Sequence, residues 1–176
     1  MIIDYASREP SDFMDIYLTA NCEFCITSGT GLGDLSGILR RPRVEVNFTP
    51  LGLLNTYKSD FLCTTKMHVL KDSQNILSLS EIFSKDAGFC DQSSIYEEKG
   101  VDFIENTPEE IRDVAIEMAE RLAGTWQAHP DDEALQQLFW KIFPTDAVNA
   151  NGVPYHGEIR SRYGADFLRN NKEWLS

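Results

Sequence analysis

The sequence has 176 residues, of which 42% are hydrophobic and 25% charged, as in ordinary globular proteins. Its formal net charge of -12 argues against non-specific binding to nucleic acid or anionic membranes, because both require a basic surface. No apolar run approaches the roughly 20 residues of a membrane-spanning helix, and residues 1–4 lack the parts of a signal peptide. We therefore expect a cytoplasmic protein with no transmembrane segment and no nucleic-acid partner.

The charge is distributed unevenly along the chain. Acidic residues concentrate between 97 and 133, which is typical of a solvated helical face. The first half is closer to balance and holds a group of basic residues: Arg40, Arg41, Arg43, Lys58, Lys66 and Lys71. An anionic small ligand is therefore expected to bind in the first half.

The first half alternates between strands and helices. The pattern predicts a strand at 1–6, a helix capped by Ser11 or Asp12, a buried strand at 22–27, a turn at 28–31, a helix at 34–40 and a strand at 44–48. Two strands joined through a helix imply a parallel pair with a right-handed crossover. Residues 50–65 are expected to wind over the surface, and 62–70 to contain a strand.

Capping patterns predict helices in the remainder. Ser78–Glu81 has capping-box spacing and opens a short helix, and 86–100 is expected to be a loop. The segment Thr107–Glu110 combines an N-cap, a proline at N1 and a glutamate at N3, and predicts a helix ending at Gly124. Further helices are expected at 131–143 and 158–174. The fold class is α/β: one domain over 1–176, with a parallel sheet, flanking helices and a helical C-terminal third.

The cysteines include one close pair, Cys22 and Cys25, with the C-x-x-C spacing of a zinc half-site or a redox pair. Cys63 and Cys90 are isolated, so no second pair completes a tetrahedral zinc site. The apolar run 24–26 beside the pair favours buried structural thiols instead. We expect no bound metal.

The strongest local signal is the turn Ser28-Gly29-Thr30-Gly31, placed between a strand and a helix. Its glycines permit positive φ and close approach of a ligand to the backbone. The first amides of the next helix point outward without partners and favour an anion, and the Ser28 and Thr30 hydroxyls add donors. The pattern is neither a Walker A loop nor a dinucleotide fingerprint, and a plain structural turn is the alternative.

Several segments occur in an order that resembles one protein family. They are 4–6, 11–18, 20–31 and 41–42 in the first half, and 103–111, 137–143, 164–171 and 174–175 in the second. Together they resemble a bacterial family of GT-B-type glycosyltransferases, whose members are similar to surface-polysaccharide and glycan-assembly proteins. The resemblance implies two Rossmann-like lobes, of which this chain would be the carboxyl-terminal, nucleotide-sugar-binding one.

The resemblance also implies roles for single residues. The turn from Ser28 to Gly31 would contact the pyrophosphate, Asp34 would lie near the ribose, and Arg8 would offset charge on the leaving group. From the residues alone, Asp34 can equally be a first-turn acid that complements the helix dipole, and Arg8 a surface arginine. No residue is identified as catalytic.

The implied substrates are a nucleotide-sugar and a glycan or lipid-linked acceptor. Such enzymes need no metal, because helix amides and basic side chains offset the charge of the leaving group. The chain is about half as long as a two-lobed enzyme, so the amino-terminal lobe is apparently absent and catalysis by this chain alone is an open question. The alternatives are a non-catalytic nucleotide-binding or scaffold domain and, with no acid–base pair identified for it, an epimerase-like lobe.

Overall fold

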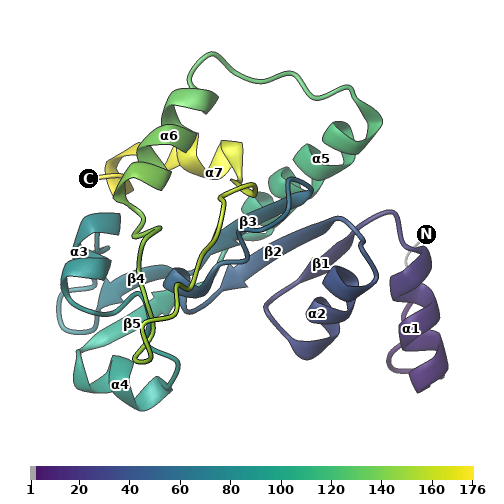
Figure 1. The fold of residues 1–176 in the computed structure, drawn as a ribbon, viewed down its shortest axis with the longest axis horizontal. Coiled ribbons are helices and arrows are strands. Elements are labelled where there is room, and N and C mark those ends of the chain that lie inside the picture. The colour runs from purple at the N-terminus through teal and green to yellow at the C-terminus, as the bar shows by residue number, and fades with distance from the viewer. Residues whose placement is uncertain (1–2) are drawn as a thin grey trace.

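The computed structural model describes residues 3–176, and a parallel sheet of four strands with flanking helices lies at its centre (Figure 1). The strand order is β1-β2-β3-β6, with bounds Cys25–Thr27, Arg43–Phe48, Phe61–Thr65 and Arg162–Tyr163. All neighbouring pairs are parallel. The carboxyl ends of the strands therefore share one edge of the sheet, and the amino ends share the opposite edge. This arrangement is consistent with a Rossmann-like fold.

The remaining elements surround this sheet. The helices are α1 (Asp12–Asn21), α2 (Gly31–Ile38), α3 (Leu79–Ser84), α4 (Ser93–Glu98), α5 (Pro108–Ala123), α6 (Asp132–Ile142) and α7 (Ala165–Asn170), with 3-10 turns η1 (Leu51–Leu53) and η2 (Lys172–Trp174). Strands β4 (Met67–Leu70) and β5 (Val101–Ile104) form a separate antiparallel pair. No helix within residues 3–176 is long and apolar enough to cross a membrane.

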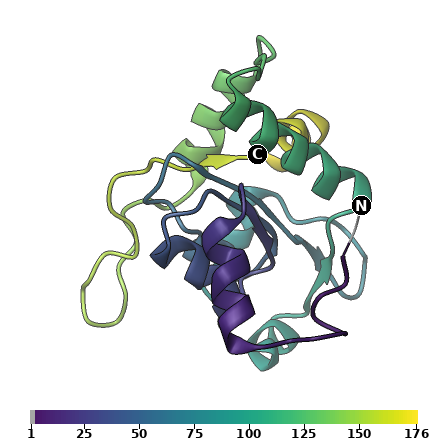
Figure 2. The same ribbon diagram turned by 90° about the vertical axis from the view of Figure 1, so that its right-hand side faces the viewer.

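The two faces of the sheet are covered differently, because successive side chains of a strand point to opposite sides. On one face, Val44 and Leu62 pack with Val114 and Met118 of α5 in a small apolar cluster. On the other face, Arg43 contacts the backbone of α2. Figure 2 shows α5 above the sheet and α1 in front of it.

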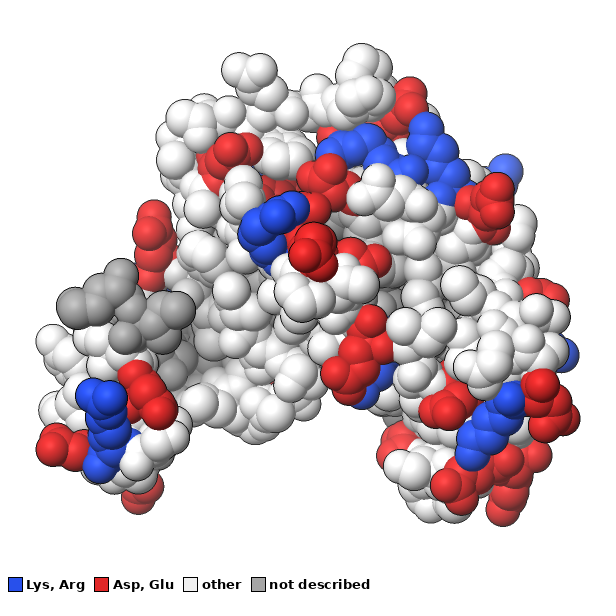
Figure 3. All heavy atoms as spheres, turned by 180° about the vertical axis from the view of Figure 1, so that it is seen from behind, with Lys and Arg blue, Asp and Glu red and all other residues white. Residues whose placement is uncertain are grey.

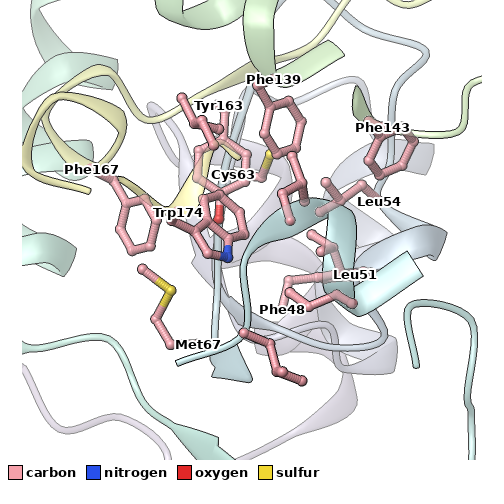
Figure 4. Close-up of a cluster of buried hydrophobic side chains, with 14 of the residues drawn as sticks. Phe48, Leu51, Leu54, Cys63, Met67, Phe139, Phe143, Tyr163, Phe167 and Trp174 are labelled. Carbon is pink, nitrogen blue, oxygen red and sulfur yellow. The ribbon is translucent and has the colours of Figure 1, made fainter. Parts of the chain in front are cut away.

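The main core lies on the second face and extends to the end of the chain. It joins residues of β3, α6, β6 and η2, among them Cys63, Phe139, Tyr163 and Trp174 (Figure 4). The rings of Phe139 and Tyr163 have centroids 4.5 Å apart. Burying aromatic side chains of this size is the largest single source of stability in such a domain.

The free edge of β6 is closed by a side chain. The side-chain carbonyl oxygen of Gln136 in α6 accepts a hydrogen bond from the Tyr163 backbone N–H, and its amide donates to the Tyr163 backbone carbonyl. Gln136 is 3% exposed, so these bonds are shielded from water. The amide side chain thus takes the place of a further strand at this edge.

The capping signals are confirmed. Ser11 caps α1, and full capping boxes with reciprocal hydrogen bonds open α3 at Ser78 and α5 at Thr107. Gly124 ends α5 with a φ of 70°, in the left-handed region that glycine tolerates best. These motifs are local in sequence, which explains why they are predictable without tertiary contacts.

Several predictions for the first half are wrong. Residues 3–6 form no strand, and residues 1–2 of that prediction lie outside the described part. The strand expected at 22–27 covers only Cys25–Thr27, and Ile26 is 47% exposed, so it is not buried. The helix expected at 34–40 begins at Gly31 instead, because Thr30 is the N-cap. The apolar side of α1 also stays exposed, with Phe13 71% accessible.

The middle and the end differ from the predictions as well. Residues 50–65 do not wind over the surface: Leu51 and Leu54 are buried and Phe61 starts β3. The loop expected at 86–100 contains α4. The helix expected at 158–174 is wrong, because the segment divides into β6, α7 and η2. The C-terminal third is therefore not purely helical, since Tyr163 completes the sheet.

Candidate functional site

The turn from Ser28 to Gly31 follows β1 directly, at the carboxyl edge of the sheet. All four residues are exposed. Gly29 has a φ of 79°, a conformation that side chains other than glycine adopt only with strain. Gly31 is the first residue of α2, and the Thr30 side chain makes no capping hydrogen bond. The structure thus places these residues at the start of a helix, as the sequence predicts.

The backbone amides of this turn are largely without partners. Gly33 and Asp34 donate to the Thr30 carbonyl at 2.8 and 3.4 Å. Within residues 3–176, the N–H groups of Gly29, Thr30, Gly31 and Leu32 have no hydrogen-bond acceptor in the protein. Four unpaired donors at a helix N-terminus, with the helix dipole behind them, favour an anion.

Close packing beneath the turn fixes its shape. A Cβ atom on Gly33 would lie 2.4 Å from Thr27 Oγ1, and one on Gly29 would lie 3.2 Å from the Phe48 ring. Helix α2 therefore approaches β1 more closely than any larger residue at position 33 would allow. The sequence reasoning missed Gly33, although the glycine spacing in 29–33 was the available signal.

A buried arginine, Arg43, contacts the backbone of α2 on the side that faces the sheet. Arg43 is 1% exposed, donates to the Gly33 carbonyl at 2.9 Å, and lies 3.2 Å from Glu45. Its guanidinium also stacks over Phe61, 4.2 Å from the ring centroid. Burial raises the pKa of Glu45, and the charge of Arg43 opposes that rise. Arg43 is therefore enclosed in the protein and does not face the turn's solvent side.

The other two predicted site residues lie outside the turn. Asp34 is in the first turn of α2, with a side chain 74% exposed and 3.5 Å from Arg43. Arg8 is exposed in the segment before α1, where its N–H donates to the Tyr5 carbonyl. Among the described residues, no ion pair or hydrogen bond joins a basic side chain to residues 28–31.

The basic residues of the first half do not converge on the turn. Arg40, Arg41 and Lys58 precede β2 and β3, so they lie toward the amino edge of the sheet, opposite the turn. Lys66 follows β3 at the carboxyl edge but pairs with Glu105 at 2.9 Å. On the face seen in Figure 3, lysines and arginines lie beside acidic residues and form no separate basic patch.

Two asparagines at the carboxyl edge form a contact that sequence reasoning did not find. Asn47 and Asn106 exchange hydrogen bonds, each backbone N–H donating to the other's side-chain oxygen at 2.7 and 2.5 Å. The Asn106 amide also donates to the Thr65 carbonyl at 2.9 Å. This pair ties the end of β2, where Asn47 has a φ of 53°, to the start of α5. Isolated asparagines far apart in sequence give no signal for such a contact.

Metal-binding groups do not gather in the part of the chain described here. Within residues 3–176, no three His, Cys, Asp or Glu side chains lie close enough to hold a metal ion. Cys22 and Cys25 are free thiols, and burial raises the pKa of both, which opposes thiolate formation. Both thiols are half-buried rather than fully buried as the sequence predicts, and no third ligand residue joins them within the described residues.

The turn lies on an open surface. Two cavities of about 790 and 640 Å³ occur elsewhere, one beside Trp174 and one beside Trp140, and residues 28–31 line neither. Comparison with family models, curated proteins and solved structures finds no match for this chain.

Proposed function

We propose that the turn from Ser28 to Gly31 binds the diphosphate of a nucleotide-sugar. On this proposal the chain is the carboxyl-terminal, donor-binding lobe of a GT-B-type glycosyltransferase, which transfers a sugar to a glycan or related acceptor. The observation that carries it is the set of four unpaired backbone N–H groups at the start of α2. Such groups bind phosphate oxygens without needing a metal ion.

The proposed chemistry uses these amides at the leaving group. When the bond between the sugar's anomeric carbon and the phosphate oxygen breaks, negative charge grows on the departing nucleoside diphosphate. Fixed N–H dipoles offset that charge without reorganising. On this proposal the exposed Asp34 carboxylate, in the first turn of α2, accepts hydrogen bonds from ribose hydroxyls.

The open position of the turn supports a two-lobed arrangement. A donor site in a cleft between two lobes leaves each lobe's share of the site on its own surface. The exposed residues 28–31 fit that expectation better than they fit a closed pocket within one domain. Acceptor contacts and a catalytic base would then come from the partner lobe.

A second candidate is a non-catalytic nucleotide-binding or scaffold domain. One observation favours it: Arg43, which donates to the Gly33 carbonyl of α2, is buried against Glu45 and Phe61 rather than turned toward the ligand side. A lobe that only holds a diphosphate needs the amides but no cation for leaving-group departure. The two candidates share the same binding site and differ only in turnover.

The sharpest test replaces Gly31, the first residue of α2. Gly31→Pro removes one N–H from the turn, and proline suits the first helical position. Thr30, with φ -91° and ψ 163°, already has the extended backbone that a following proline requires. Gly31→Ala is the matched control, since it keeps the N–H and its Cβ meets no atom within 4 Å.

We expect Gly31→Pro to weaken binding of UDP, GDP or ADP about tenfold relative to Gly31→Ala, because a hydrogen bond to a charged group contributes roughly 1.5–3 kcal/mol. Isothermal titration calorimetry measures both variants, and urea unfolding checks that they are equally folded. Equal affinities of the two variants, or no binding by the unaltered chain, would overturn the assignment.

A further inference from the structure

The cavity of about 640 Å³ lies between α6 and the segments that enter β3 and β6. These segments are at the amino edge of the sheet, whereas the turn after β1 is at the carboxyl edge. The residues that matter for its chemistry are Trp140, Lys141, Ile159, Arg160, Ser161 and Arg162. The backbone N–H groups of Arg160 and Ser161 both donate to the Thr56 carbonyl, at 2.7 and 3.2 Å, which holds this wall in place.

Positive charge gathers at this cavity although the chain as a whole has a net charge of -12. Three cations, Lys141, Arg160 and Arg162, line it together with one carboxylate, Glu133. Arg162 pairs with Glu133 at 2.9 Å and Arg160 pairs with Glu158 at 2.5 Å, and the two carboxylates are 64% and 72% exposed. Lys141 forms no ion pair within residues 3–176. Since exposed ion pairs contribute little stability, these cations can change partners at small cost.

Two polar atoms in this wall are buried and have no hydrogen-bond partner within the described residues. They are Ser161 Oγ and Arg162 Nε. Ser161 is only 4% exposed, and both residues line the cavity. Buried polar atoms in native proteins are nearly always paired, so these two are candidates to gain a partner when a ligand fills the cavity and their side chains rotate toward it. Both atoms can donate a hydrogen bond, as an anion requires.

An aromatic ring forms part of the cavity wall. Trp140 is half-buried, and its ring meets Phe139 and Phe143 edge to face, with centroids 4.7 and 5.3 Å apart. These contacts hold the indole in one orientation. Together with Ile159, it gives the cavity an apolar side next to the cations. A flat ring of a ligand can stack on such a surface.

We propose that this cavity binds a phosphate ester that carries an aromatic ring, such as a nucleotide. The phosphate lies among Lys141, Arg160 and Arg162, and it accepts hydrogen bonds from Ser161 and Arg162. The aromatic base lies against Trp140. The site is separate from the turn at Gly29–Gly31 and does not depend on the glycosyl-transfer proposal.

Titration calorimetry with inorganic phosphate and with AMP tests the two halves of this site, and tryptophan fluorescence reports on the ring contact. All variants in this experiment also carry Gly31→Pro, so that binding at the turn is reduced. AMP is expected to bind about tenfold more tightly than phosphate. The double variant Lys141→Gln, Arg160→Gln should lower AMP affinity at least tenfold, and the exposed Lys71→Gln serves as its control.

Trp140→Leu separates stacking from charge. It is expected to lower AMP affinity about tenfold and to leave phosphate affinity unchanged, a pattern that general loss of structure would not give. Failure of AMP to bind, or equal binding by the double variant and Lys71→Gln, would overturn the proposal. Neither result tests binding at the turn. That site is tested independently, by comparing the nucleoside diphosphate affinity of Gly31→Pro with that of Gly31→Ala.

Discussion

His68 in β4 is a buried titratable side chain without a polar partner. It is 0% exposed, its ring lies 4.9 Å from that of Phe103 and 6.0 Å from that of Tyr96, and neither nitrogen has a hydrogen-bond acceptor or donor within residues 3–176. Burial lowers its pKa from 6.5 to about 4, and the Lys66 backbone, which is near the ring but not in hydrogen-bonding geometry, opposes only part of that change. The neutral ring packs like an apolar residue.

This residue makes stability depend on pH. Between pH 6.5 and 4 the unfolded chain binds a proton at His68 while the folded chain does not, so stability falls as pH falls across that window. The full effect is about 3 kcal/mol, at 1.36 kcal/mol for each unit of pKa. We expect His68→Leu to weaken this dependence in urea unfolding at pH 7 and pH 4.5.

The exposed His129 provides the control for this experiment, because its side chain is 53% exposed and His129→Gln removes an imidazole from the surface rather than from the core. Burial also lowers the pKa of His156, so a smaller dependence is expected to remain in His68→Leu. If His68→Leu and the unaltered chain lost the same free energy on acidification, His68 would not be the responsible group.

At the level of elements, Gln136 controls one edge of the sheet. Gln136→Leu keeps a similar volume but leaves the Tyr163 N–H and carbonyl buried without partners. We expect a loss of roughly 3 kcal/mol in the free energy of unfolding, from the cost of two unsatisfied groups.

The neighbouring Gln137 is exposed on the same helix, and Gln137→Leu is the matched control. It adds the same side chain without touching β6, so its unfolding free energy should change by less than about 0.5 kcal/mol. Equal losses in the two variants would show that the side-chain pairing at Tyr163 is unimportant.

The elements that the sequence predicts well are those with local signals. The capping boxes at Ser78 and Thr107, the strand at 44–48 and the turn at 28–31 depend on neighbouring residues. The two-residue strand β6 was missed because its existence depends on β3 and Gln136, which are distant in sequence. Tyr163 fits the apolar pattern of a helix as well as that of a strand, so periodicity alone cannot distinguish a helix from a strand at this position.

The candidate site was predictable only in part for the same reason. The backbone donors at 29–32 follow from local glycine and helix signals. Whether cations lie near these donors depends on the tertiary structure. Arg43 is buried, and Arg40 and Arg41 lie toward the amino edge of the sheet, opposite the turn. Arg160 and Arg162 lie in a segment for which periodicity predicts a helix, so the sequence does not indicate that they line a cavity with Lys141.

At the level of the whole molecule, the sheet order follows the chain order. Neighbouring strands β1, β2 and β3 are joined by the short segments 28–42 and 49–60, whereas β3 and β6 are joined by the long segment 66–161. Each doubling of a connecting loop costs about 0.6 kcal/mol of chain entropy. Pairing of the first three strands is therefore the easier step.

We expect hydrogen exchange during refolding to protect the amides of β2 and β3 before that of Gly164, whose N–H donates to the Cys63 carbonyl. Pulse labelling with mass spectrometry measures this order. Simultaneous protection of both sets would show instead that the sheet forms in one step.

The main core has a consequence for newly made chains, since it joins Cys63 in the sheet to Trp174 and Leu175 near the last residue. On a ribosome, the early strands leave the exit tunnel well before the residues that cover them. Their apolar side chains are then exposed to solvent during synthesis, and exposed surface of this kind is what chaperones bind and what drives nascent chains to aggregate.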